Sequence, residues 1–361
     1  MLIRAMLLLI TGMLALCATG DDFAPARPMP SLSLSDERVD VIAFGSCFNG
    51  SSPDHIYSTI QKAQPDVFLF IGDNVYAADE RDDPGLASLR SAYADLAKSK
   101  PFRALRRRVP VLATWDDHDF GLNDAGGDWL HKMTSQALFQ HVWAVADDDP
   151  RQSRDGVYFK RTVGPRGERV QFILLDTRFF RPPLYRPTEA PAAGGRYLPT
   201  DDPKQSMLGD AQWNWLASAL AEPADVRIIA TSIQLIADGH NWEAWRTMPK
   251  ERERFLALLG EIDTKGVILI SGDRHSSAMY RLDDARLDVP LWEVTASSLN
   301  RPLTALVSVD EITAEPGPNR VGDPFYDTNF GIIEIDWQAS RAILQIRDEA
   351  GRTVRASTAE F

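Results

Sequence analysis

The segment Val67-Phe-Leu-Phe-Ile-Gly-Asp73 is a short run of aromatic and branched apolar residues that ends in a glycine and a carboxylate. Four other apolar runs also end in a polar cluster: they close at Gly-Ser-Cys47, Trp-Asp-Asp-His-Asp119, Leu-Asp-Thr-Arg178 and Ser-Gly-Asp-Arg-His275. Apolar runs of strand length that alternate with helical stretches indicate α/β layers. Because ligands of open α/β sheets bind beyond the carboxyl ends of the strands, we expect these five clusters to converge on one site.

The alternation of strands and helices extends over most of the chain. Strands are predicted at 39–47, 67–73, 109–116, 157–163, 170–176, 226–236, 267–273, 291–296, 331–337 and 342–347. Helices are predicted at 53–64, 86–107, 129–145, 210–221 and 249–262. The stretch 182–203 is rich in proline, glycine and alanine and is expected to be a surface loop. No linker interrupts the pattern, so residues 38–361 are predicted to form a single domain with closing C-terminal strands.

The composition limits the classes of protein to consider. Hydrophobic residues make up 44% and charged residues 25% of the 361 residues, which fits neither a disordered chain nor a polytopic membrane protein. The formal net charge is −12 and no long basic run offsets it, so no nucleic-acid-binding platform is expected. An acidic protein can still act on a phosphorylated substrate when bound metal ions reverse the local charge. Two cysteines exclude a disulfide-stapled fold.

The first twenty residues have the pattern of an export signal. Arg4 precedes an apolar stretch at 5–16 that is too short to span a bilayer comfortably; the alternative is a disordered apolar N-terminus. Cys17 resembles the lipidated cysteine of a bacterial lipoprotein signal, although Leu16 stands where a small residue is usual. We expect residues 1–20 to be a signal and residues 21–37 a flexible Pro-rich linker. The mature chain, without a transmembrane helix, is then periplasmic, secreted or lipid-anchored at the cell envelope.

The polar clusters contain side chains suited to two different cations. Several anions in one crevice repel one another, and bound cations remove this repulsion. Thiolate, phenolate and imidazole ligands suit a transition metal such as ferric iron, whereas positions with carboxylates alone suit calcium, magnesium or manganese. The residues therefore indicate two unlike ions that share Asp73, an arrangement used for phosphoryl displacement. Cys47, the lone thiol after signal removal, is expected to be a ligand rather than a small buried apolar residue.

Seven motifs in chain order carry a resemblance to a known family. They are Phe44-Gly-Ser-Cys47, Gly72-Asp-Asn-Val-Tyr76, Thr114-Trp-Asp-Asp-His118, Leu175-Asp-Thr-Arg178, Leu208-Gly-Asp-Ala-Gln-Trp213, Ser232-Ile-Gln234 and Ser271-Gly-Asp-Arg-His275. From Val39 to the closing strands the chain resembles the alkaline phosphatase D family of the calcineurin-like metallophosphatase superfamily. The resemblance implies a four-layer αββα sandwich and hydrolysis of phosphate mono- or diesters, with Fe³⁺ and Ca²⁺ as the metals.

The resemblance also implies which residues bind the two ions. Asp73 would bridge them, and the iron would be completed by Cys47, Tyr76 and His275. Asp117 and Asp273 stand where the wider superfamily has Asn and His, so they would bind the second ion. This replacement by carboxylates favours calcium, or magnesium or manganese, over zinc.

His118 is the candidate for protonating the leaving group, because a histidine titrates near neutrality. Asp116 or Asp119 is expected to orient its ring, and a hydroxide on the metal ions is the expected nucleophile. The candidates for holding phosphate oxygens are Asn74, Arg178 and Arg274. For Arg178 the alternative is a structural ion pair with Asp176. His240 is a candidate for the mouth of the site, whereas His55, His131 and His141 have no matching partners.

Two rival functions stay open at this point. A dedicated phosphodiesterase or phospholipase-type hydrolase needs a groove that accepts a second ester arm, and the 182–203 loop is the segment that would decide this. A non-catalytic surface binding protein that keeps the fold would be expected to lose a ligand or the acid. Every position carried over from the family is filled, which favours an enzyme.

Overall fold

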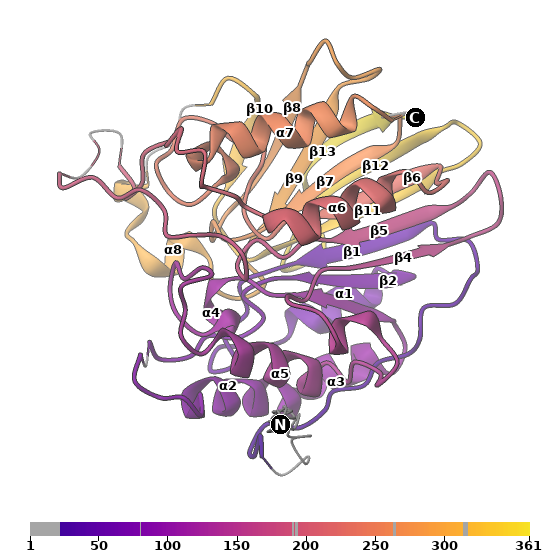
Figure 1. Ribbon diagram of the computed structural model, residues 1–361. Helices are drawn as coiled ribbons and strands as arrows, with labels where there is room; N and C mark the ends of the chain where they lie inside the picture. Colours follow the sequence, from indigo (N-terminus) through magenta and orange to yellow (C-terminus); the bar gives the residue numbers. More distant parts are fainter. Residues whose placement is uncertain (1–21, 80, 190, 192–193, 263–264, 313–316) are drawn as a thin grey trace, which may run out of the picture.

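The computed structural model describes residues 22–79, 81–189, 191, 194–262, 265–312 and 317–361. It contains two β-sheets (Figure 1). The first sheet has the order β13 (Thr353–Glu360), β12 (Arg341–Asp348), β11 (Asn329–Asp336), β1 (Val41–Gly45), β2 (Val67–Ile71), β3 (Val111–Thr114). The second has the order β10 (Arg320–Phe325), β8 (Ser277–Leu282), β9 (Leu291–Ala296), β7 (Val267–Ser271), β6 (Val226–Ala230), β5 (Val170–Leu174), β4 (Phe159–Val163).

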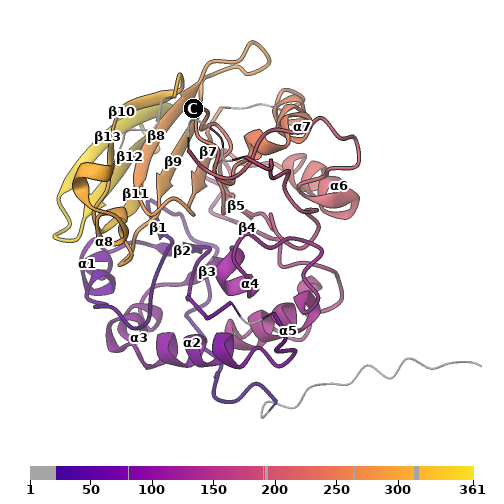
Figure 2. The same cartoon turned by 90° about the vertical axis from the view of Figure 1, so that its left-hand side faces the viewer.

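The two sheets pack face to face, and helices cover their outer faces. On the first sheet lie α1 (Ile56–Lys62), α2 (Ala87–Lys98), α3 (Lys100–Arg106) and α5 (Lys132–Val142); on the second lie α6 (Gly209–Leu220) and α7 (Pro249–Leu259). Figure 2 shows these two groups of helices on opposite sides of the molecule. The predicted four-layer αββα sandwich is confirmed.

The location of strand β2 between two layers explains why its sequence is apolar at every position. Phe68 and Phe70 pack into the core beneath the helices, whereas Val67, Leu69 and Ile71 pack into the core between the sheets. Side chains alternate between the faces of a strand, so a strand covered on both faces needs apolar residues throughout. The continuous run therefore reflects the position of β2 between two layers.

The parallel strands direct the polar clusters to one region. Strands β1, β2 and β3 are parallel neighbours in the first sheet, and β5, β6, β7 and β9 are parallel neighbours in the second. The segments that follow the carboxyl ends of parallel strands emerge at the same edge of a sheet. The residues after β1, β2, β3, β5 and β7 are the five clusters found in the sequence.

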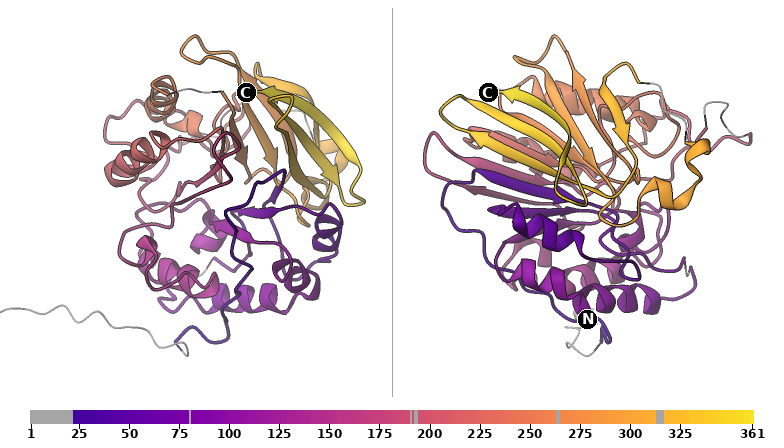
Figure 3. Two further views of the ribbon diagram at one scale, coloured as in Figure 1. Left: turned by 90° about the vertical axis from the view of Figure 1, so that its right-hand side faces the viewer. Right: turned by 180° about the vertical axis from the view of Figure 1, so that it is seen from behind.

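Several element boundaries differ from those predicted. The predicted helix at 86–107 is two helices, because Ser99 leaves the helical conformation and its hydroxyl accepts the Phe102 N–H at 3.1 Å, with Pro101 in the first turn of α3. The strand predicted at 226–236 ends at Ala230. Strands β8, β10 and β13 were not predicted. Figure 3 shows the C-terminal strands at the margin of the molecule, and β13 is an edge strand with alternating polar residues that give a weak apolar pattern.

Residues 22–37 differ from the expected flexible linker. They have no helix or strand, but Ala26 and Met29 are buried against the helical layer. The Met29 N–H donates to the Val142 carbonyl at 2.7 Å, and the Arg106 guanidinium donates to the Pro30 carbonyl at 2.8 Å. This segment is therefore fixed to the domain. The predicted signal and Cys17 lie outside the described residues, and within the described ranges no helix is long and apolar enough to cross a membrane.

Candidate metal centre

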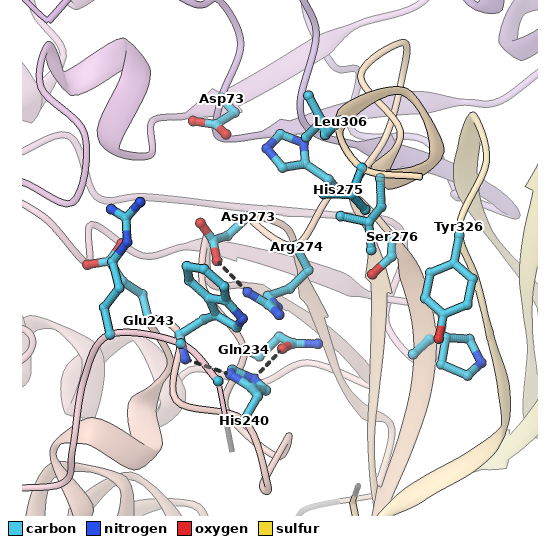
Figure 4. A pocket seen from close by; sticks show the side chains of 18 of the residues that line it. Asp73, Gln234, His240, Glu243, Asp273, Arg274, His275, Ser276, Leu306 and Tyr326 are labelled. Carbon is cyan, nitrogen blue, oxygen red and sulfur yellow. Dashed lines mark hydrogen bonds and ion pairs between the residues drawn. The ribbon is translucent and has the colours of Figure 1, made fainter. Parts of the chain in front are cut away.

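The ends of the two sheets meet at the candidate site. Cys47 follows β1, Asp73 follows β2, and Asp273 and His275 follow β7. Contact between the sheets requires glycine at position 272, because a Cβ there would lie 2.5 Å from the Ser46 hydroxyl oxygen. Figure 4 shows Asp73, Asp273 and His275 facing one pocket. The strand ends thus converge as the sequence predicted.

Four of the predicted ligands have an uncommon backbone conformation. Cys47, Asp73, Asp273 and His275 have positive φ angles of 59°, 49°, 68° and 53°. This left-handed region is unfavourable for most residues other than glycine, and such residues cluster at functional sites. The conformation turns the chain sharply at the end of each strand. Asp73, Asp273 and His275 line the pocket, whereas Cys47 is fully buried and does not line it.

Asp73 lies at the centre of the cluster. One of its carboxylate oxygens, Oδ2, accepts a hydrogen bond from the Tyr76 hydroxyl at 2.6 Å and lies 3.5 Å from the Cys47 sulfur. Its other oxygen, Oδ1, lies 3.4 Å from the backbone nitrogen of His118. Possible ligand atoms of Asp73, Asp117 and His118 lie within 4.8 Å of one another. Asp73 therefore has a separate set of neighbours on each carboxylate oxygen, as a bridging ligand requires.

A second acidic group lies beside the first. Carboxylate oxygens of Asp116, Asp117 and Asp273 come within 4.8 Å of one another. Asp117 belongs to both groups and begins the short helix α4 (Asp117–Phe120). The structure thus brings the two predicted second-ion ligands, Asp117 and Asp273, together, and Asp117 also lies beside Asp73.

The His275 ring is held in the tautomer that a metal ligand needs. Its Nδ1 lies 2.9 Å from the Arg301 carbonyl oxygen, so Nδ1 carries the proton and Nε2 keeps a free lone pair. The ring centroid lies 6.0 Å from that of Tyr76. Burial, and then the charge of Arg301, lowers the pKa of His275 to about 3, so the ring is neutral at physiological pH. A neutral imidazole is the form that binds metals.

The electrostatics of the carboxylates also fit bound cations. Burial, and then the charges of Cys47 and Asp117, raises the pKa of Asp73 well above its ordinary value. Burial, and then Asp116, raises the pKa of Asp273 in the same way, and burial raises the pKa of the Cys47 thiol. Buried acids that repel one another are stabilised by a cation in the crevice. Together with the left-handed turns, this makes the acidic groups around Asp73 and Asp117 suitable for metal ions; in the described part of the chain Cys47 and His275 belong to none of these groups.

Asp119 joins two of the motif loops. Its carboxylate accepts hydrogen bonds from the backbone N–H groups of Asp116 at 2.6 Å, Asp73 at 3.2 Å and Asn74 at 3.3 Å. The Asp116 carboxylate in turn accepts hydrogen bonds from the Ser232 hydroxyl at 2.6 Å and from the Arg178 Nε–H at 2.6 Å. Both carboxylates therefore have other partners, and the prediction that one of them orients the His118 ring is wrong. Within the described part of the chain that ring contacts Tyr76, with centroids 4.3 Å apart, and has no hydrogen bond.

The three candidates for phosphate binding lie in different surroundings. The Arg178 side chain is fully buried between Asp116 and Glu243, with Nη1 2.7 Å from the Glu243 carboxylate. Asn74 is also fully buried, and its amide donates to the Thr114 carbonyl at 2.8 Å. Neither lines the pocket, whereas Arg274 does. Arg274 is thus the candidate that a ligand in the pocket could reach, whereas Arg178 and Asn74 have buried protein partners. The expected Arg178–Asp176 ion pair is replaced by ion pairs with Asp116 and Glu243.

Several pocket residues had no sequence signal. Glu243, Asp124, Arg196 and Trp242 line the same pocket as four of the predicted ligands, and none follows a predicted strand. Cys47 and Tyr76 do not line it. Oxygens of Asp117, Asp124 and Glu243 form a third acidic group. Burial raises the pKa of Glu243 to about 7, although two arginines favour its carboxylate form. His240 lines the pocket as the sequence allowed, with its Nε2 3.0 Å from the Gln234 amide oxygen.

Gly72 provides a test of the loop that presents Asp73. Its φ is +104°, and a Cβ there would lie 2.6 Å from the Asp116 Cβ. Gly72→Ala is therefore expected to lower the free energy of unfolding by roughly 2 kcal/mol or more, measured by denaturant titration. The matched control is Gly167→Ala, which has φ +90° but no atom within 4 Å of the added Cβ. Equal losses of unfolding free energy in the two variants would show that the contact with the Asp116 Cβ is not the cause.

The fold defines the class: an αββα sandwich of the metallophosphatase type. The chain belongs to the PhoD-like phosphatase family, whose model matches residues 42–344. Membership places it in a family of phosphoric ester hydrolases.

A curated protein and a solved structure show what the chain is similar to. Alkaline phosphatase D of Bacillus subtilis (strain 168) is 22% identical over 303 residues, covering 72% of this chain and 50% of that protein. The chain thus spans about half the length of this curated relative. A solved structure described as the structure of PhoD matches with a TM-score of 0.65 and 17% identity, over 92% of this chain and 74% of that one, which supports the shared fold.

Proposed function

We propose that the chain is a metal-dependent phosphoesterase that hydrolyses phosphate mono- or diesters. The observation that carries this proposal is the position of Asp73. Cys47 and Tyr76 lie beside one of its carboxylate oxygens and the backbone nitrogen of His118 lies near the other, while possible ligand atoms of Asp117 and His118 come within 4.8 Å of it. Cys47, Asp73, Tyr76 and His275 would hold Fe³⁺, and Asp73, Asp117 and Asp273 would hold Ca²⁺, or Mg²⁺ or Mn²⁺. When bound, the ions supply charge neutralisation and an activated water.

The remaining roles belong to the chain itself. Hydrolysis forms a P–O bond to water and breaks the P–O bond to the ester arm, which leaves as an alcohol after it receives a proton. His118 lines the pocket beside Asp73 and would donate that proton. Arg274, whose Nη1 lies 4.0 Å from the Asp273 carboxylate, would bind a phosphate oxygen.

Turnover and metal content test this proposal together. Freshly purified protein is expected to hydrolyse p-nitrophenyl phosphate or bis-p-nitrophenyl phosphate and to contain iron and a second metal by elemental analysis. The ratio of the two rates separates a monoesterase from a dedicated phosphodiesterase. Protein that contains both metals and hydrolyses neither ester would instead be a binding protein that retains the fold.

Tyr76 gives a spectroscopic test of the proposed iron ligands. A phenolate bound to ferric iron produces a visible charge-transfer band, so Tyr76→Phe is expected to remove the colour of the purified protein. Tyr57→Phe is the control, because Tyr57 is buried in the helical layer and its ring packs against Phe48 and Phe102 rather than against a proposed ligand. A band that persists in Tyr76→Phe would remove Tyr76 from the ligand set.

An exported location is proposed on the sequence of residues 1–20 alone. Removal of this segment by a signal peptidase would give a periplasmic or secreted protein, and lipidation of Cys17 would give an anchored one. The mass of the mature protein distinguishes cleavage, lipidation and an intact N-terminus.

A further inference from the structure

The pocket extends well beyond the candidate ligands. Its volume is about 470 Å³, large enough for an organic molecule and much larger than a phosphate group requires. Beyond the carboxylates its lining includes an apolar wall, formed by Leu303, Leu306, Val307, Ile312, Pro324 and Tyr326. The pocket therefore has one end suited to a phosphoryl group and a wall suited to an apolar group.

The apolar wall is attached directly to the loop that carries His275. The Leu303 N–H, at the start of α8 (Leu303–Leu306), donates to the His275 carbonyl at 2.7 Å. Two residues earlier, the Arg301 carbonyl oxygen accepts a hydrogen bond from the Nδ1–H of the His275 ring. In Figure 4, Leu306 and Tyr326 lie on the His275 side of the pocket and Glu243 lies on the other side. An ester arm that leaves the metal end along this side would meet the apolar wall at once.

The same wall exposes apolar surface. Leu306 is 44% and Val307 39% exposed, although both line the pocket. Apolar side chains left exposed at a pocket are stabilised when a ligand removes them from water. Elsewhere in the lining, the guanidinium groups of Arg196 and Arg274 lie 5.6 and 5.7 Å from the Trp242 ring centroid.

We propose that the apolar wall binds the organic arm of the substrate, so that the enzyme prefers phosphate esters with an apolar arm of several carbons. This inference rests on the proposed function, because that function places the phosphoryl group at the candidate metal centre. The wall then determines specificity through the length and polarity of the arm.

Two alkylphosphonates test the wall without any bond being broken. Ethylphosphonate and hexylphosphonate carry the same anionic group, and their C–P bonds resist hydrolysis. Calorimetry with the purified, metal-containing protein is expected to show at least about tenfold tighter binding of hexylphosphonate, because four more methylene groups leave water. Leu306→Ser is expected to reduce this preference about threefold or more. Val309→Ser is the matched control, since Val309 is 69% exposed on the same segment and does not line the pocket.

Equal affinities for the two phosphonates, or an unchanged preference in Leu306→Ser, would overturn the inference. Equal losses in Leu306→Ser and Val309→Ser would do the same. Hydrolysis of the p-nitrophenyl esters, measured on the same preparation, tests the proposed function separately. A chain-length preference without hydrolysis would support the apolar site and contradict the proposed phosphoesterase activity. Hydrolysis without a chain-length preference would support the activity and contradict the apolar site.

Discussion

His118→Ala is expected to lower kcat/KM for an alkyl phosphate ester by about 10²- to 10⁴-fold, the usual effect of removing a general acid. An alkoxide is a poor leaving group and needs a proton as the P–O bond breaks. A p-nitrophenolate leaves without that help, so the loss with a p-nitrophenyl ester is expected to be much smaller. Steady-state kinetics with the two esters measure this difference.

The geometry also allows His118 to be a metal ligand instead of the general acid, and the same variant distinguishes these two roles. A ring nitrogen of His118 lies within 4.8 Å of possible ligand oxygens of Asp73 and Asp117, so the ring could bind a metal. A general acid leaves the metal content of His118→Ala unchanged, whereas a ligand lowers it. His55→Ala is the control, because His55 pairs with Glu349 on the surface and lies outside the pocket. Equal rate losses for both esters, or loss of metal, would contradict the assignment as acid.

The sequence predicted that the residues of the candidate site would meet, because each of them follows an apolar strand. Asp73 comes two positions after β2, and Asp273 comes two positions after β7. Parallel strands end at a common edge, so local sequence was sufficient to predict that distant residues meet. The turn conformation was not predictable from apolar patterns, yet the positive φ of Asp73 and Asp273 is what directs their side chains.

The outer parts of the pocket could not be predicted in this way. Glu243 and Trp242 lie in a loop, and α8 has four residues without a polar–apolar repeat. Their positions depend on tertiary contacts, such as the bond from Leu303 to His275, that leave no periodic signal. The roles of buried polar groups were equally hidden. An arginine is a residue type that often binds phosphate, but Arg178 is fully buried and paired with carboxylates. Its burial, which the sequence does not show, is what separates a structural role from a substrate-binding one.

Arg178→Met is expected to lower the free energy of unfolding by about 3–5 kcal/mol, because it leaves two buried carboxylates without their shared cation. The guanidinium is fully buried and pairs with Asp116 and Glu243. Glu243 keeps a second partner, since the Arg181 guanidinium lies 2.6 Å from its other oxygen. Asp116 keeps only the Ser232 hydroxyl among the side chains that contact it in the described structure. Denaturant unfolding at constant pH measures the loss.

Arg341→Met is the matched control for that loss. Arg341 pairs with Asp336 at 3.0 Å, but its side chain is 49% exposed, and exposed ion pairs contribute about 0–1 kcal/mol. Arg178→Lys restores one charge without the planar fork and is expected to fall between the two. If Arg178 bound substrate instead, Arg178→Met would raise KM with little loss of stability. A stability change no larger than that of Arg341→Met would therefore return Arg178 to the substrate-binding candidates and contradict a stabilising role for its ion pairs with Asp116 and Glu243.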